Sequence, residues 1–125
     1  MLTETGTLPN GVEYEGKTHR GYELREQLVS DAVEILESRD KTLLARAEKS
    51  DSFFNVCVMA KRIVRIGSIP KESITPDVVM NMTQGDFNEF VSATRRMEER
   101  RRRFRAEDGT PAEDGNSAPQ PGVHV

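Results

Sequence analysis

The segment from Gly11 to Thr18, with the sequence GVEYEGKT, constrains the fold more than any other, because it admits two incompatible structures. It matches the G-x-x-x-x-G-K-[ST] pattern of a phosphate-binding loop, which leaves a buried parallel strand and opens into a helix whose N-terminus faces the phosphates. It can also form two turns with a short strand between them. The first structure belongs to a nucleotide-binding protein, and the second to an antiparallel sheet.

The flanks of this segment favour the antiparallel sheet. Residues 1–8 lack the run of Val, Ile and Leu that a buried parallel strand requires, and residues 18–24 suit a strand better than a helix N-terminus. The alternation of apolar and acidic side chains over residues 12–15 is also that of a strand, and it would place two carboxylates beside the phosphates. We therefore predict three strands, at residues 2–8, 12–14 and 18–24, with Lys17 exposed. Nucleotide binding through Lys17 is the least favoured function.

Helical patterns begin after residue 28. Ser30 and Asp31 offer a helix cap, and an apolar stripe predicts a first helix over residues 31–38; residues 40–49 either extend it or form a second piece. That stripe consists of Val29, Ala32, Val33 and Leu36. The most apolar pattern predicts a core helix over residues 51–66, closed by Gly67.

Two further start signals follow in the chain. Thr75-Pro76 predicts a short helix ending near residue 82, and Thr83 caps a long final helix. The predicted fold is α+β: one domain over residues 1–105, in which a small N-terminal antiparallel β-meander (residues 1–25) is packed by three to four α-helices (residues 30–105). Residues 106–125 are acidic and rich in Pro and Gly, with few large apolar side chains, so we expect a disordered tail.

Composition argues against catalytic and metal chemistry. Cys57 lies within an apolar helical pattern, as a buried thiol would, and His19 and His124 are the only imidazoles, too few for a zinc site. We expect no metal, no cofactor and no enzymatic activity. The longest apolar stretch, near residues 53–60, is too short to cross a bilayer, and no secretory signal precedes it, so we expect a cytoplasmic protein without a membrane partner.

Three groups of segments carry a resemblance to a known family. They are the stretch from Met59 to Pro70 (MAKRIVRIGSIP), the stretch ITPDVV with the later TQGDF, and the N-terminal pieces LPNG, GKT, LR and SD. In this order and spacing they resemble the tail assembly proteins of Mu-like bacteriophages and prophages, over roughly residues 8–99. An Arg-rich extension and an acidic tail depart from the pattern of that family.

The resemblance implies a non-enzymatic tail assembly chaperone in the cytoplasm of a bacterial host. Such a protein binds the long helical tape measure protein and keeps it soluble until the tail tube forms around it. The tail tube protein and a second copy of the chain are further candidate partners. The family supplies no catalytic residues.

A chaperone for a helical client needs adaptable apolar side chains at its surface, which Met and Phe provide. Phe87, Phe90 and Val91 also fit a core role, which their spacing favours, whereas Met97 and Phe104 are expected where the last helix outruns the domain. Arg101 takes the next inward position of that helix. The candidate partner-binding residues are Met80, Met82, Phe87, Phe90, Met97, Arg101 and Phe104.

Seven arginines between residues 95 and 105 support an alternative function, a small nucleic-acid-binding regulator. Against it, residues 1–94 carry a net charge of −4 from 11 basic and 15 acidic side chains, and the Arg-rich helix contains a single aromatic residue, Phe104. Glu98 and Glu99 are also spaced to pair with Arg102 and Arg103. A solvated helix face or a surface for an acidic partner is favoured, and the acidic tail is a candidate internal competitor for these arginines.

Overall fold

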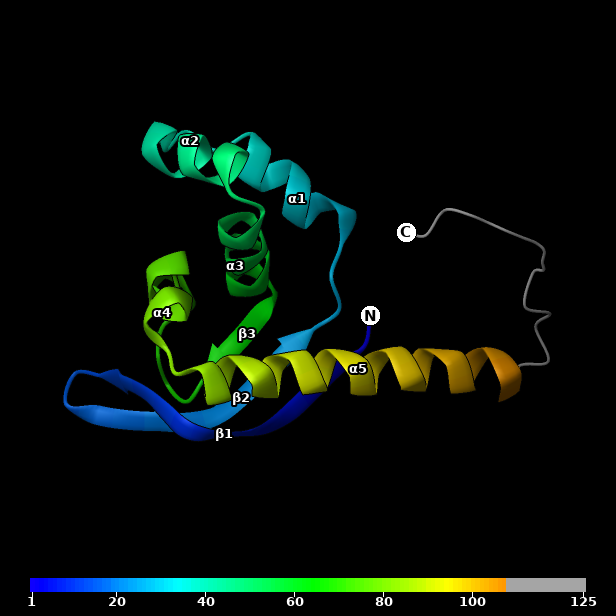
Figure 1. The fold of residues 1–125 in the computed structure, drawn as a ribbon. Coiled ribbons are helices and arrows are strands. Elements are labelled where there is room, and N and C mark those ends of the chain that lie inside the picture. Colours follow the sequence, from blue (N-terminus) through cyan, green and yellow to red (C-terminus); the bar gives the residue numbers. More distant parts are fainter. Residues whose placement is uncertain (108–125) are drawn as a thin grey trace.

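The computed structural model describes residues 1–107 and has the expected α+β class (Figure 1). Its antiparallel sheet has the strand order β1-β2-β3, formed by β1 (Thr3–Tyr14), β2 (Lys17–Arg25) and β3 (Ile63–Ile66). Five α-helices and one short 3-10 helix complete the described chain. Residues 106 and 107, predicted to begin the tail, instead continue the last helix; the remainder of the predicted tail lies outside the described residues.

The prediction of three strands within the first 25 residues is wrong, because residues 9–11 do not reverse the chain. β1 continues through them, and the only reversal between β1 and β2 is at Glu15-Gly16. Thr7 pairs with Gly21 and Val12 with His19, so residues 8–11 of β1 lie opposite Arg20 alone. The Pro-Asn-Gly sequence therefore forms part of a large β-bulge rather than a turn. Pro and Gly are tolerated in a strand at such a bulge.

The third strand comes from the end of the segment predicted as the core helix. That helix, α3 (Asp51–Arg62), starts as expected with Ser50 capping the Phe53 amide at 3.1 Å, but it stops before Ile63. Ile63, Val64 and Ile66 are β-branched and favour an extended chain. The Lys71 ammonium donates to the carbonyls of Ala60 and Lys61, both at 3.2 Å, and so satisfies the helix end.

The other helices begin close to the residues that the sequence signals predicted. α1 (Val29–Leu36) and α2 (Lys41–Lys49) are separate, with Asp40 capping the second. A 3-10 turn, η1 (Lys71–Ser73), precedes α4 (Pro76–Asn81) and the long α5 (Gln84–Glu107). α5 runs along β1 and continues past the sheet, whereas α1 and α2 lie at the far end of α3 (Figure 1).

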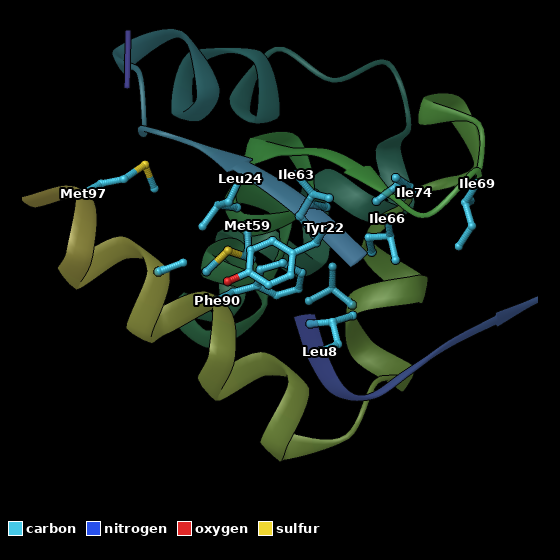
Figure 2. Close-up of a cluster of buried hydrophobic side chains, with 13 residues drawn as sticks. Leu8, Tyr22, Leu24, Met59, Ile63, Ile66, Ile69, Ile74, Phe90 and Met97 are labelled. Atoms are coloured by element: carbon cyan, nitrogen blue, oxygen red, sulfur yellow. The ribbon is translucent and has the colours of Figure 1, made fainter. Parts of the chain in front are cut away.

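Two apolar clusters hold these elements together. The larger lies between the sheet, α3 and α5, and Figure 2 shows Tyr22, Met59 and Phe90 close together within it. The Tyr22 and Phe90 rings meet edge to face, with centroids 4.9 Å apart. The smaller cluster joins α1, α2 and α3 through Ile35, Ala47, Phe53, Cys57 and Val58, so Cys57 is buried as predicted.

The apolar stripe predicted on the first helix does not face the core. Asp31 and Ile35 are buried instead, while Val29, Val33 and Leu36 are exposed. Arg25 explains why α1 turns its Asp31 side to the core. The Arg25 guanidinium donates to both carboxylate oxygens of Asp31, at 2.7 and 3.0 Å. The Leu28 amide donates to the same carboxylate at 2.8 Å, so Asp31 also caps α1.

Candidate functional site

A neutral groove lies between the first half of α3, α4 and the start of α5, with a volume of about 430 Å³. Its apolar lining comes from Val56, Val79, Met80, Met82 and Phe87. Its polar lining consists of uncharged side chains, those of Ser52, Asn55, Thr83 and Gln84. We call these nine residues the α3–α5 groove. The structure therefore brings three of the predicted partner-binding residues, Met80, Met82 and Phe87, to one place.

The floor of the α3–α5 groove packs against the larger core cluster, and its rim is exposed. Val79 is buried, and Val56, Met82 and Phe87 are half-buried against the larger core cluster. Met80 is 43% exposed, and its flexible thioether side chain can follow the shape of a ligand. Apolar side chains that line a groove are a common means of binding one face of an amphipathic helix, and here uncharged polar side chains lie among them.

Phe90 and Met97 do not contribute to this surface. Phe90 is fully buried against Tyr22, as the core role proposed for it requires. Met97 is only 2% exposed, so the expectation that it lies beyond the domain is wrong. The reason is that β1 and β2 extend further along α5 than a meander of three short strands would, and the core reaches Met97 (Figure 2).

Arg101 and Phe104 lie at the far end of α5. Arg101 forms a two-point ion pair with Glu26, with distances of 2.7 and 3.1 Å, and this contact holds the pKa of the Glu26 carboxyl below its usual range. Phe104, 43% exposed, is past this anchor. These two residues therefore form a region separate from the α3–α5 groove.

Most arginines of the Arg-rich helix are engaged in ion pairs. Glu4 of β1 receives Arg96 at 2.6 Å and Arg100 at 2.5 Å, and Arg96 also reaches Glu89 at 3.1 Å. Arg102 and Arg103 both pair with Glu99, whereas the predicted pairing of Glu98 is absent from the described residues. The main structural role of this run is thus to fasten α5 to the N-terminal hairpin.

The structure excludes a phosphate-binding loop at residues 11–18. Lys17 is an exposed residue of β2, and a strand rather than a helix follows the glycines. The Asn10 and Gly11 amides donate to the buried Asp86 carboxylate at 2.9 and 3.0 Å. The amide of the first motif residue, Gly11, and the amide before it are therefore occupied by a negatively charged side chain.

Among residues 1–107, no group of three or more His, Cys, Asp or Glu side chains is arranged to hold a metal ion. Within the same residues, no helix combines the length and the apolar character that crossing a membrane requires.

No protein-family model matches the chain, and comparisons with curated proteins and with solved structures find no match. The residues themselves therefore carry the functional interpretation.

Sequence reasoning missed one exposed apolar surface, the outer side of α1. Val29, Val33 and Leu36 have the spacing of a core-facing stripe, and periodicity alone cannot show which side of a helix meets the core. The available signal was Asp31, four residues from Ile35, with Arg25 close before it in the sequence. A buried ion pair on the inner side would have placed the apolar stripe outside.

Proposed function

We propose that this chain is a non-enzymatic phage tail assembly chaperone that binds the tape measure protein and keeps it soluble in the cytoplasm of a bacterial host. A resemblance in sequence and a feature of the structure support the proposal. The first is the resemblance of residues 8–99 to tail assembly proteins of Mu-like phages. The second is the α3–α5 groove, which offers a helical client a surface of apolar and uncharged polar side chains.

The α3–α5 groove carries the proposal, because its chemistry matches the requirement of such a client. A tape measure protein is long and helical, and before assembly its helices expose apolar faces to water. Burial of such a face stabilises a complex by about 25 cal/mol per Å² of apolar surface removed from water, before the cost of ordering is subtracted. The flexible side chains of Met80 and Met82 can adapt to the shape of a client helix.

The nucleic-acid alternative is not adopted. Arg96, Arg100 and Arg101 bind carboxylates of the hairpin or of α5. Phosphate binding by these guanidiniums would have to displace contacts that fasten α5 to the sheet. A binding surface for DNA or RNA would instead present its cations unpaired.

Co-expression with the tape measure protein tests this function. The wild-type chain should raise the soluble fraction of the tape measure protein, and Met80→Glu should abolish much of this gain, because the substitution brings a charge into the α3–α5 groove. Val64→Glu is the matched control, since Val64 is similarly exposed, at 39% against 43%, but belongs to β3.

Far-UV circular dichroism of both variants would verify that they fold. Failure of the wild-type chain to raise the soluble fraction would refute the proposed function. Equal loss in the two folded variants would refute the assignment of the α3–α5 groove as the binding site.

A further inference from the structure

The segments that build the α3–α5 groove carry carboxylates but no cations. All nine lining residues lie within residues 50–60 and 72–94. These two stretches contain five Asp or Glu side chains and no Lys or Arg. The whole chain has 18 Lys and Arg against 21 Asp and Glu, so the lack of cations is a local feature of the groove.

Three of the five carboxylates have other places in the structure. Asp86 is buried and accepts two backbone amides, Glu89 forms an ion pair within α5 at 3.1 Å, and Glu72 lines a different cavity. Asp51 and Asp77 are exposed, and neither takes part in an ion pair among residues 1–107. These two carboxylates can therefore meet the cations of a partner.

Asp51 and Asp77 are neighbours of groove-lining residues. Asp51 is one helical turn before Asn55 of α3, and Asp77 is three residues before Met80 of α4. Figure 1 shows α4 beside α3. The groove is thus bordered by one free carboxylate on each of these helices.

A second cavity adjoins the α3–α5 groove and is acidic. It has a volume of about 410 Å³, lies between β1 and α4, and shares Met82 and Thr83 with the groove. Its charged lining residues are Glu13 and Asp77. A bound helix that extends past Met82 and Thr83 would therefore meet carboxylates.

One cation shares a further cavity with Asp77. Arg46 of α2 lines that cavity, and its guanidinium stacks on the Phe53 ring, 4.1 Å from the centroid. Arg46 does not line the α3–α5 groove, and within the described part of the chain it forms no ion pair with Asp77. The charges that border the groove are thus negative, and exposed charges act over a Debye length of roughly 8–10 Å.

We propose, on the premise that the α3–α5 groove is the client site, that the client segment is an amphipathic helix with Lys or Arg side chains beside its apolar face. The apolar side chains of that helix fill the uncharged groove, and the cations beside them meet Asp51 and Asp77. A helix bordered by Asp or Glu would instead bring like charges together, which lowers its affinity and its rate of association. The groove thereby selects among the apolar faces of a long helical client.

Three synthetic peptides test this preference on the wild-type chain. Each is a helix of about 18 residues, or five turns, with the same apolar stripe, and they differ only in having Lys, Gln or Glu beside that stripe. Fluorescence anisotropy should rank the affinities as Lys above Gln above Glu, with about tenfold or more between the first and the last at low salt. Raising the salt to about 0.5 M should bring the three affinities together, because exposed charges are screened.

Variants locate the preference in the groove. Asn55→Lys places a cation in the lining and should reverse the ranking, so that the Glu-bordered peptide binds best. Gln27→Lys is the matched control, because it adds the same charge at another exposed residue, outside the groove, and should leave the ranking unchanged. The double variant Asp51→Asn with Asp77→Asn should lose most of the preference for the Lys-bordered peptide.

Equal affinities of the three peptides for the wild-type chain, or tighter binding of the Glu-bordered peptide, would overturn the proposal. A ranking altered equally by Asn55→Lys and Gln27→Lys would also overturn it, since overall charge would then be the cause. Absence of binding by every peptide at about 0.5 mM would overturn both the preference and the groove as a helix site. Co-expression tests the chaperone function separately, so equal affinities of the peptides would leave that function standing.

Discussion

At the scale of single residues, Gly11 is required for the bulge rather than for nucleotide chemistry. Its φ of +97° is unfavourable for other residues, and an added Cβ would lie 2.7 Å from Arg20 Cγ and 2.9 Å from the His19 carbonyl oxygen. Gly16 also has a positive φ, of +80°, but has no atom near a Cβ position. The two glycines of one motif therefore serve different purposes, a packed bulge and an open turn.

This difference predicts unequal effects of alanine at the two positions. Gly16→Ala should lower the free energy of unfolding by about 1 kcal/mol through backbone strain alone. Gly11→Ala should lower it by about 3 kcal/mol, because steric overlap adds to the strain and shifts the amides that bind Asp86. Urea unfolding followed by circular dichroism measures both values. Equal losses would show that the bulge is not tightly packed.

Asp31 makes stability dependent on pH. Burial raises the pKa of its carboxyl, but the hydrogen bonds from Arg25 and from the Leu28 amide outweigh burial and leave the pKa below its ordinary value of about 3.9. The folded chain therefore binds fewer protons here than the unfolded chain. The stabilisation is complete above the ordinary pKa and is lost as pH falls through the lowered one.

We predict that the free energy of unfolding falls between about pH 5 and about pH 2, and that Asp31→Asn makes this slope shallower. The same variant should be less stable at pH 7, because Arg25 loses its charged partner. Urea titrations at several pH values, with the exposed Glu37→Gln as control, provide the measurement. A slope unchanged by Asp31→Asn would disprove the role of this ion pair.

At the scale of elements, α1 is inverted relative to its apolar pattern, and this inversion can be measured. Ile35→Ala removes a side chain from the smaller core cluster and should cost about 3 kcal/mol. Val33→Ala changes an exposed side chain and should alter stability by less than about 0.5 kcal/mol. Thermal or urea unfolding compares them. A larger loss for Val33→Ala would place the stripe in the core after all.

The Arg-rich half of α5 depends on Glu4 for its attachment. Glu4 receives both Arg96 and Arg100, so Glu4→Gln should leave Arg100 without its carboxylate and Arg96 with Glu89 alone. We predict faster amide hydrogen exchange over residues 96–105 and an effect that shrinks in high salt. Glu99→Gln is the control, because its contacts stay within α5. Equal exchange in the two variants would show that α5 is held by its apolar face alone.

Local sequence signals predicted where most helices start. The bulge in β1 and the third strand depend instead on contacts between residues far apart in the sequence. Ser50 and Thr83 marked starts correctly because each accepts a hydrogen bond from an amide three residues later, and Thr75 did so because Pro76 follows it. The bulge at residues 8–11 depends on Asp86, more than 70 residues away, and no local pattern could reveal that clamp. The strand at Ile63–Ile66 forms only because β2 offers an edge, with Gly67 donating to the Gly21 carbonyl at 2.7 Å.

The same distinction applies to the candidate site. Met80, Met82 and Phe87 were predicted as surface candidates from residue type and lie together, because α4 and the start of α5 are close in sequence. Met97 was misplaced because its burial depends on the length of the hairpin. The α1 stripe was missed because the orientation of that helix depends on the Arg25–Asp31 ion pair.

At the scale of the whole molecule, the hairpin, α5 and α3 form a framework with two separate surfaces. One is the α3–α5 groove, which rests on the larger core cluster. The other is the exposed outer side of α1, formed by Val29, Val33 and Leu36.

Hydrogen exchange of the chain with and without the tape measure protein tests the central claim most directly, because it locates the client on the fold. The account predicts slower exchange over residues 52–56 and 79–87, which line the α3–α5 groove, and unchanged exchange in β3. Met80→Glu should remove this protection. Protection confined to other elements, or no protection with a tape measure protein that stays in solution, would contradict the account.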